Sequence, residues 1–222
     1  MESIHGKRAL RIDAPALLGH LAGYQDILLD IGAGDGRFVR QMAAECPARF
    51  AIGVDACREN LRASSRVAPA NALYLIADAR ALPCALDQQA THITINFPWG
   101  SLLSGLLAGE AALLERLAAV ARPGALLELR LNAGALAEAG WALADSGEQV
   151  RQALHMAGFH VRPPIALGPQ ELRACPTTWA KRLAYGRIHR GDLRERNRGR
   201  DEAVHGRLTR GGGPPSASAG DT

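Results

Sequence analysis

Residues 27–36 read Ile-Leu-Leu-Asp-Ile-Gly-Ala-Gly-Asp-Gly, an apolar run that passes directly into a glycine-rich turn. Further short apolar runs follow and alternate with segments of helical periodicity. This alternation is typical of a parallel sheet with helices on both faces, so we predict an α/β fold whose first strand ends at the turn. Strands are expected at residues 27–31, 50–54, 73–77, 92–97 and 125–131, with two more at 159–161 and 204–208.

Helical patterns fill the intervals between these strands. One begins after Gly36 and places its apolar residues on one face. Residues 110–121 repeat leucines at helical spacing, and the Arg-Pro-Gly sequence at 122–124 is expected to end that helix. A further helix is predicted at 149–157.

Length and composition limit the organisation of the chain. Its 222 residues suffice for one α/β core, and we predict a single domain over residues 1–210. The glycine-, proline- and serine-rich residues 211–222 cannot bury an apolar face and are expected to be disordered. No apolar run approaches the roughly 20 residues that cross a bilayer, and no signal-like segment follows Met1. We therefore expect a cytoplasmic protein without a membrane span.

The four cysteines are scattered along the chain without a pair at two-residue spacing. That pattern argues against a disulfide framework and against a zinc site, so no metal is predicted. Positive charge, by contrast, is concentrated. Between Trp179 and Arg210 there are ten Lys or Arg and four Asp or Glu, and ten minus four leaves six excess positive charges, against +4 for the whole chain. Such a stretch is expected of a protein that meets a phosphate backbone; a solvated tail without a partner is the alternative.

The spacing of the glycines in the turn selects among cofactors. One residue separates Gly32, Gly34 and Gly36 from one another. A dinucleotide fingerprint places its third glycine one position later, where Arg37 stands. Asp30, at the strand end, suits the α-ammonium of a methionine moiety, whereas it would repel a phosphate. The turn therefore favours S-adenosylmethionine over a nicotinamide cofactor.

Two more carboxylates follow strands of the predicted sheet. Asp55 ends the second strand about 20 residues after the turn, where an acidic residue usually accepts the ribose hydroxyls. Asp78, just past the third strand, is placed to accept the exocyclic amine of adenine. The alternative is that these acids, Asp30 included, merely cap helices. The predicted cofactor site comprises Asp30, Gly32, Ala33, Gly34, Gly36, Asp55, Ala56, Asp78, Ala79 and Phe97.

Residues 96–100, which read Asn-Phe-Pro-Trp-Gly, follow the fourth predicted strand. Class I methyltransferases place the residues that face the accepting atom there. Because proline fixes its own φ, Pro98 would hold Trp99 in one orientation at the mouth of the pocket. The alternative is a core tryptophan packed beneath a helix, since most tryptophans are largely buried.

A block near the C-terminus makes a family resemblance specific. Residues 177–187 read Thr-Thr-Trp-Ala-Lys-Arg-Leu-Ala-Tyr-Gly-Arg. Together with the Gly-Lys pair at 6–7 and residues 29–37 and 97–103, this block resembles the Kam/Npm-type 16S rRNA methyltransferases. Those enzymes use S-adenosylmethionine to methylate N1 of adenine 1408 in the 30S decoding site and confer aminoglycoside resistance. The resemblance implies a class I, Rossmann-like fold with a mostly parallel seven-stranded sheet. It also implies that the protein acts as a monomer.

The resemblance also implies roles for individual residues. Trp99 and Trp179 would clamp a flipped adenine, with Pro98 and Thr177 shaping the pocket. Extrusion of the base costs a few kcal/mol, and stacking on two indoles offsets it by about 1–3 kcal/mol per base. Adenine N1 is unprotonated near neutral pH and already carries a free lone pair, so no strong general base is needed. Most of the acceleration would come from aligning N1 with the methyl group. The implied RNA contacts are Lys7, Arg8, Lys181, Arg182 and Arg187, and the product is S-adenosylhomocysteine.

Two features depart from the family pattern. The stretch 61–73 is short and offers only Arg62 and Arg66, where the family has a long, lysine-rich linker that docks on rRNA. An arginine-rich insertion at 190–200 precedes the predicted last strand, and we hypothesise that basic contacts have moved there. Two other functions stay open: a methyltransferase of the same fold that acts on another RNA or a small molecule without resistance activity, and a non-catalytic cofactor- or RNA-binding module.

Overall fold

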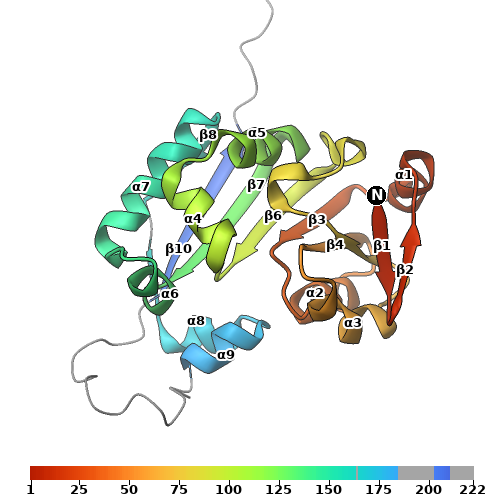
Figure 1. Cartoon of the computed structure of the whole chain (residues 1–222), viewed down its shortest axis with the longest axis horizontal. Helices are drawn as coiled ribbons and strands as arrows, with labels where there is room; N and C mark the ends of the chain where they lie inside the picture. Colours follow the sequence, from red (N-terminus) through yellow and green to blue (C-terminus); the bar gives the residue numbers. More distant parts are fainter. Residues whose placement is uncertain (164, 185–202, 211–222) are drawn as a thin grey trace, which may run out of the picture.

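One mixed sheet runs through the computed structural model, which describes residues 1–163, 165–184 and 203–210 (Figure 1). Within these residues the strand order is β2-β1-β5-β4-β3-β6-β7-β10-β8, and β9 pairs with β10. The predicted tail at 211–222, the insertion at 190–200 and Arg187 lie outside the described residues.

The seven predicted strands are confirmed, with small shifts at their ends. Five of them pair in parallel, and β10 is antiparallel to its neighbours β7 and β8, which gives the mostly parallel arrangement expected. Their bounds are β3 (Asp26–Ile31), β4 (Arg49–Asp55), β5 (Ala72–Ile76), β6 (Ala90–Asn96), β7 (Ala121–Asn132), β8 (Phe159–Val161) and β10 (Ala203–Arg210). Two expectations need correction: β6 stops before Phe97, and the Arg-Pro-Gly sequence at 122–124 lies inside β7.

Three short strands extend the sheet beyond the prediction. A hairpin of β1 (Glu2–His5) and β2 (Arg8–Arg11) adds to the β5 edge, and β9 (Ile165–Leu167) lies along β10 next to β8. Gly6 has a φ of +58° in the tight turn between β1 and β2. β1 and β2 have polar residues at both ends, so they lack the apolar runs on which the strand predictions depended.

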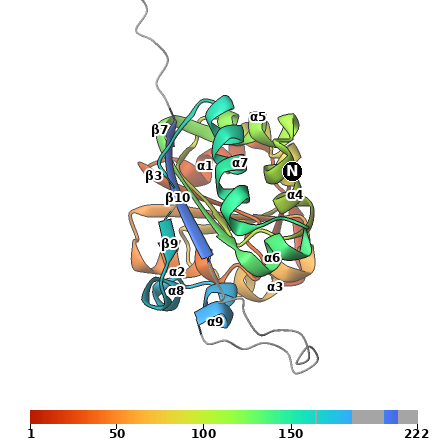
Figure 2. The same cartoon turned by 90° about the vertical axis from the view of Figure 1, so that its left-hand side faces the viewer.

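Helices cover both faces of the sheet, as predicted. One face packs against α1 (Ala14–Leu21), α4 (Gly100–Ala108), α5 (Ala111–Val120), α6 (Ala133–Glu138) and α7 (Leu143–Met156). Figure 2 shows α4 to α7 together on one side of β10. The other face packs against α2 (Arg37–Glu45) and α3 (Arg58–Arg66). Two 3₁₀ turns, η1 (Ala79–Ala81) and η2 (Cys84–Leu86), follow β5. Among the described residues, none of these helices is long and apolar enough to span a bilayer.

The core follows from the alternation of side chains along buried strands. In β3, Ile27, Leu29 and Ile31 face the α4–α7 side, whereas Leu28 packs on the α2–α3 side with Tyr74. Because both faces are covered, the central strands are apolar on both sides and appear as continuous apolar runs in the sequence. That is why the strand predictions were accurate.

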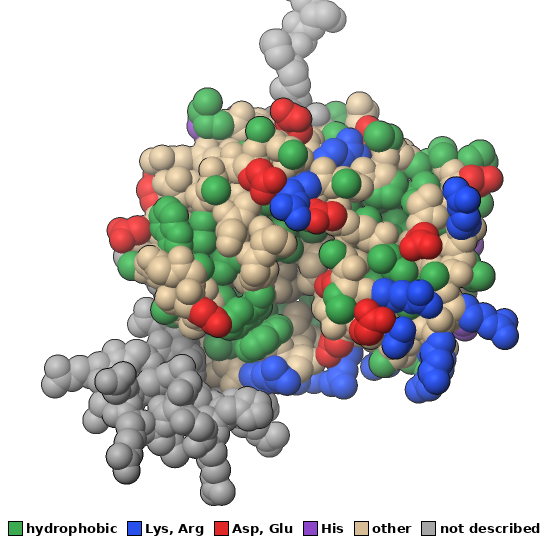
Figure 3. All heavy atoms as spheres, in the orientation of Figure 1, with side chains coloured by type: hydrophobic (Ala, Val, Ile, Leu, Met, Phe, Trp, Pro, Cys, Tyr) green, Lys and Arg blue, Asp and Glu red, His purple; other side chains and the backbone are tan. Residues whose placement is uncertain are grey.

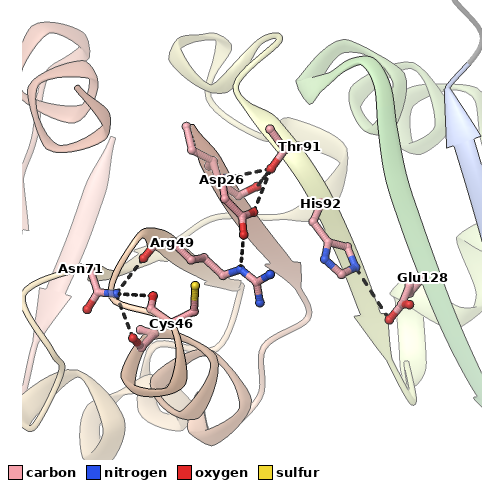
Figure 4. A network of polar contacts seen from close by, with 9 residues as sticks. Asp26, Cys46, Arg49, Asn71, Thr91, His92 and Glu128 are labelled. Atoms are coloured by element: carbon pink, nitrogen blue, oxygen red, sulfur yellow. Dashed lines mark hydrogen bonds and ion pairs between the residues drawn. The ribbon is translucent and has the colours of Figure 1, made fainter. Parts of the chain in front are cut away.

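Polar contacts tie the amino ends of the central strands together (Figure 4). Asp26 accepts a hydrogen bond of 2.8 Å from Nε of Arg49 and another of 3.1 Å from the Thr91 hydroxyl, which links β3, β4 and β6. Asn71 donates to three carbonyl oxygens, including that of Arg49 at 2.7 Å. At the amino ends of the central strands, these polar groups are therefore bonded to one another, so we expect a ligand site at the carboxyl ends.

Two short helices, α8 (Pro169–Ala174) and α9 (Thr178–Ala184), lie by the carboxyl ends of the parallel strands (Figures 1 and 2). A small apolar cluster holds them there, in which Phe97 packs with Leu172 and Ala180. The loop after β6 and the C-terminal helices are therefore one packed unit.

Candidate active site

A cavity of about 540 Å³ opens at the carboxyl ends of the central strands. Ligand sites of this size bind small molecules, and crevices at the carboxyl ends of parallel strands are where α/β proteins bind them. Most of the predicted site lines it: Asp30, Gly32, Ala33, Gly34, Asp55, Ala56, Asp78, Ala79, Phe97, Pro98, Trp99, Thr177, Trp179 and Arg182. The segment after β3 and the segment near the C-terminus therefore meet in one cavity.

Asp30 is a buried carboxylate at the end of β3. Its Oδ1 accepts a hydrogen bond of 2.6 Å from the Thr94 hydroxyl and one of 2.9 Å from the Asn96 amide. The side-chain oxygen of Asn96, Oδ1, in turn accepts a hydrogen bond of 2.6 Å from the Arg130 guanidinium, which pairs with Glu128 at 2.9 Å. Both bonds to Asp30 reach Oδ1, so the other oxygen, Oδ2, accepts neither of them. This arrangement does not cap a helix, and the capping alternative is wrong for Asp30.

Burial raises the pKa of Asp30 to about 7, although the hydrogen bonds from Thr94 and Asn96 and the nearby Arg130 charge lower it. A desolvated carboxylate is unfavourable unless a positive group pairs with it. The α-ammonium of S-adenosylmethionine is such a group, so the chemistry of Asp30 fits the predicted cofactor.

Asp55 fastens the glycine turn to the end of β4. Its Oδ2 accepts from the Gly34 amide at 2.8 Å and its Oδ1 from the Cys57 amide at 2.8 Å. The Asn60 amide group donates to Oδ1 as well, at 3.3 Å. The residue that caps α3 is Cys57, so Asp55 is not a cap either. The carboxylate lies beside the turn at the cavity wall, as the predicted ribose contact requires.

Asp78 differs from the other two acids. Its side chain caps η1 through the Arg80 amide at 2.9 Å, and the Arg80 guanidinium donates to both carboxylate oxygens, at 2.8 and 2.6 Å. The hydrogen bonds from Arg80 lower the pKa of Asp78 to about 2. Asp78 therefore caps a helix and also lines the cavity, and a contact with the adenine amine has to share a carboxylate already bound to Arg80.

The glycines of the turn have two different tasks. Gly34 and Gly36 have φ values of +53° and +68°. No atom lies within 4 Å of where a Cβ of Gly34 would stand, so its backbone is open to the cavity. A Cβ on Gly36 would lie 2.5 Å from the Tyr74 ring. Gly36, predicted as a cofactor contact, is absent from the residues lining the cavity and instead packs on Tyr74.

The segment after β6 turns sharply to present Trp99. Phe97 has a φ of +52°, a rare conformation for a bulky residue, and its buried side chain packs beneath α8 and α9. Pro98 follows at the cavity wall. Backbone strain of this kind is common at functional sites, where surrounding packing compensates it.

The two predicted base-stacking tryptophans contact each other. The ring centroids of Trp99 and Trp179 are 4.9 Å apart with an angle of 30° between the planes. A ring inserted between them would need ~3.5 Å on each side, or ~7 Å in all. The two rings therefore leave no room for a third ring between them in this structure. Within the described residues, the buried Nε1 of Trp99 has no hydrogen-bond partner.

Residues around Trp179 fix it to the site. The Thr177 hydroxyl accepts from the Ala180 amide at 2.9 Å and so caps α9. The Arg182 guanidinium lies 5.0 Å from the centre of the Trp179 ring, a cation–π distance. The Thr178 hydroxyl donates to Asp35 in the glycine turn.

Several functional candidates escaped the sequence analysis. In the second halves of β6 and β7, polar residues alternate with apolar ones, and that signal could have revealed the network around Asp30; the residues are Thr94, Asn96, Glu128 and Arg130. Asp35 had no such signal, because its partner lies 143 residues away.

Three RNA candidates among the described residues, Lys7, Arg8 and Lys181, do not line the cavity. Lys7 and Arg8 are exposed in the β1–β2 hairpin, and Lys181 is exposed on α9. In the described part of the chain, no cluster of three or more His, Cys, Asp or Glu side chains could hold a metal.

Comparisons with known proteins agree on one family. The family model described as NpmA, 16S rRNA (adenine(1408)-N(1))-methyltransferase, matches residues 2–196. The 16S rRNA (adenine(1408)-N(1))-methyltransferase of Streptoalloteichus hindustanus is 31% identical over 203 residues, which cover 84% of this chain and 94% of that protein.

Solved structures resemble the chain over nearly its full length. A crystal structure of the antibiotic-resistance methyltransferase Kmr has a TM-score of 0.74 at 31% identity and covers 96% of this chain and 100% of its own. A tryptophan-to-alanine mutant of the 16S rRNA (adenine(1408)-N(1))-methyltransferase from Catenulisporales acidiphilia, with cosubstrate SAM, has a TM-score of 0.78. It covers 96% of this chain and 98% of its own at 21% identity, a likeness of fold.

Replacing each of two glycines by alanine should separate binding from packing. Gly36→Ala is expected to lower the free energy of unfolding by about 2–5 kcal/mol, because the left-handed backbone costs about 1–2 and the clash with Tyr74 about 1–3. Gly34→Ala should cost only the backbone term of about 1–2 kcal/mol while weakening S-adenosylmethionine binding. Urea unfolding measures the free energy of unfolding, and calorimetric titration measures the affinity for S-adenosylmethionine. Equal destabilisation by the two substitutions would contradict the packing role given to Gly36.

Asp30→Asn should stabilise the folded protein at pH 8 and weaken its binding of S-adenosylmethionine. The folded pKa of about 7 lies above the ordinary 3.8, so this group's contribution to stability falls as pH rises from 3.8 to about 7. The variant removes that slope and is expected to be up to ~4 kcal/mol more stable at pH 8, while losing most of its affinity for S-adenosylmethionine. Urea unfolding at pH 5 and 8 tests this; a variant less stable at pH 8 would refute the desolvation argument.

Proposed function

Because the chain belongs to the NpmA family of 16S rRNA (adenine(1408)-N(1))-methyltransferases, we propose that it methylates N1 of adenine 1408 in 16S rRNA, giving aminoglycoside resistance. Its cosubstrate is S-adenosylmethionine, and the product is S-adenosylhomocysteine. The observation that carries the proposal is that the glycine turn and both stacking tryptophans line one cavity. The 30S subunit, rather than free rRNA, is the proposed substrate.

Three parts of the chain would hold the cofactor. Asp30 would accept from the α-ammonium, the open backbone of Gly34 would allow close approach, and Asp55 would accept from the ribose hydroxyls. When bound, S-adenosylmethionine supplies an electrophilic methyl group on sulfur. Adenine N1 would donate its lone pair to that methyl group, S-adenosylhomocysteine would leave with the electrons of the S–C bond, and the methylated base would carry the positive charge. No side chain has to remove a proton from N1.

The tryptophans would receive the flipped base after they separate. The centroid distance of 4.9 Å has to rise to ~7 Å before adenine can lie between the rings. Stacking on aromatic faces contributes about 1–3 kcal/mol per base, and the same faces favour the positive charge that develops on the product. Clamping also fixes N1 along the line of the S–C bond, which is the main source of rate in an orientation mechanism.

A basic surface beside the cavity is suited to the phosphate backbone. Arg62 and Arg66 are on α3, which packs against the β1–β2 hairpin that carries Lys7 and Arg8. Figure 3 shows Lys and Arg side chains gathered over this part of the molecule, at the lower right. Arg58 donates to the Lys7 carbonyl at 2.9 Å and the Gly6 amide donates to Ser65 at 3.0 Å, so hairpin and helix form one surface. The basic residues of the hairpin and those of the short stretch 61–73 would therefore contact the phosphate backbone together.

We further propose one catalytic domain over residues 1–210 that acts as a monomer in the cytoplasm, where its rRNA substrate is located. The support for the monomer is that the cofactor residues and both tryptophans belong to the same chain and line the same cavity. The hypothesis that residues 190–200 supply further rRNA contacts concerns residues outside those described and stays a prediction.

Methyl transfer to purified ribosomal particles tests the function. Tritium transfer from S-adenosylmethionine to 30S subunits, free 16S rRNA and tRNA should label 30S, with a primer-extension stop at adenine 1408. Trp99→Ala and Trp179→Ala should each lower the rate by at least tenfold, the equivalent of a lost stacking contact, while the Kd for S-adenosylmethionine changes less than threefold.

The matched control is Trp141→Ala, since Trp141 is part-exposed and does not line the cavity. It should retain the wild-type rate. Label in tRNA alone would contradict the proposed substrate, and loss of cofactor binding in both tryptophan variants would contradict the placement of the tryptophans.

Charge reversal on α3 tests the docking surface. The double variant Arg62→Glu, Arg66→Glu should weaken 30S binding at least tenfold and reduce the slope of log Kd against log salt by about 1.5, the value for two lost phosphate contacts. The control, Arg162→Glu, lies next to β8 at the opposite edge of the sheet and should leave the slope unchanged. An unchanged slope in the double variant would exclude this surface.

A further inference from the structure

Asp35 connects two parts of the site that are far apart in sequence. It lies between Gly34 and Gly36 in the turn, and its Oδ2 accepts a hydrogen bond from the Thr178 hydroxyl. Thr178 is the first residue of α9 and directly precedes Trp179. Both Asp35 and Thr178 line the cavity. One hydrogen bond thus joins the cofactor turn to the helix that carries a stacking tryptophan.

The turn holds the Asp35 end of this contact firmly. Its other oxygen, Oδ1, accepts from the Arg37 amide at 3.1 Å, at the start of α2. The Asp35 carbonyl accepts from the Ser64 hydroxyl on α3. Oδ2 also lies 3.4 Å from Nε of Arg37. The position of the carboxylate is therefore set by the backbone of the turn and by the two helices behind it.

The other attachments of α9 lead elsewhere. The Thr177 hydroxyl caps the helix from within, and Ala180 packs on Phe97 and Leu172. In the part of the chain that the structure describes, the bond from Thr178 is the one hydrogen bond between α9 and the glycine turn. A change in the turn has this direct polar route to Trp179.

We propose that Asp35 is a positioning residue that couples occupancy of the cofactor turn to the position of Trp179. Gly34 directly precedes Asp35, and its backbone is open to the cavity, so a cofactor in contact with Gly34 acts on the turn that positions the Asp35 carboxylate. A displacement of this turn moves Asp35 and, through the bond to Thr178, the tryptophan beside it. Two ligands that favour the same arrangement of the turn and α9 raise each other's affinity.

The coupling has a reciprocal consequence. If bound S-adenosylhomocysteine favours the arrangement that receives the base, it raises the affinity for RNA. Bound RNA must then raise the affinity for S-adenosylhomocysteine by the same factor. The identity of the base rests on the proposed function, but the coupling between turn and tryptophan does not. This separation allows the two claims to be tested independently.

Thr178→Val removes the hydroxyl and keeps the shape of the side chain, without altering the turn. Thr178→Ser is the matched control, since it retains the donor. In the wild-type protein, S-adenosylhomocysteine should lower the Kd for 30S at least fivefold, and 30S should lower the Kd for S-adenosylhomocysteine by the same factor. In Thr178→Val both factors should fall below twofold while the Kd for S-adenosylhomocysteine in the absence of RNA stays within threefold; Thr178→Ser should restore the coupling.

A second measurement uses no RNA. With Trp141→Phe as background, tryptophan emission reports on Trp99 and Trp179, and S-adenosylhomocysteine should change it. Adding Thr178→Val should abolish that change, and adding Thr178→Ser should preserve it. Asp35→Asn, which keeps an acceptor oxygen, should also preserve most of it. Thermal unfolding of each variant checks that the fold is intact.

The outcomes separate the two claims. A full emission response or unchanged mutual tightening in folded Thr178→Val would overturn the role of Asp35, even if adenine 1408 is methylated. Loss of the emission response in that variant, together with methylation of a different RNA, would support the role of Asp35 and refute the proposed substrate.

Discussion

The site depends on one buried carboxylate at the end of the central strand. Asp30 pairs in register with Thr94 on β6, Thr94 pairs with Glu128 on β7, and Asn96 pairs with Arg130. Because side chains alternate along each strand, these polar groups share one face of three adjacent strands and bond to one another. The network keeps Asp30 hydrogen-bonded, yet burial still raises its pKa, so ionisation of Asp30 is unfavourable in the free protein and a cationic ligand offsets that cost.

The topology explains why the other elements meet at that carboxylate. Strand β3 lies between β4 and β6, the point where the strand order reverses, and ligands of open α/β sheets bind outside the carboxyl ends there. The loops after β3, β4 and β6 therefore converge without long connections. Helix α9 reaches the same place from far along the chain, and the apolar packing of Phe97 with α8 and α9 brings Trp179 against Trp99.

Sequence reasoning captured the parts governed by local pattern. The seven predicted strands, the glycine turn and the roles of Asp30 and Asp55 as cavity residues followed from apolar runs and from the position of acids after them. It missed the Thr178–Asp35 bond, because the two residues are 143 positions apart, and it missed two local features that no apolar pattern marks, the left-handed Phe97 and the ion pair between Asp78 and Arg80. The closed tryptophan pair was equally hidden, because spacing along the chain does not reveal the distance between two rings.

The closed pair changes how the energetics of base capture should be understood. Under the proposed function, two indole–base contacts would replace one indole–indole contact when adenine enters, so the net gain would be about one stacking contact, or ~1–3 kcal/mol. Flipping a base out of its helix costs a few kcal/mol. Stacking would therefore roughly balance extrusion and add little affinity of its own. Affinity for the ribosome would then have to come from phosphate contacts on the basic surface, whereas the tryptophans would contribute orientation of N1 and selectivity for a base that is easily extruded.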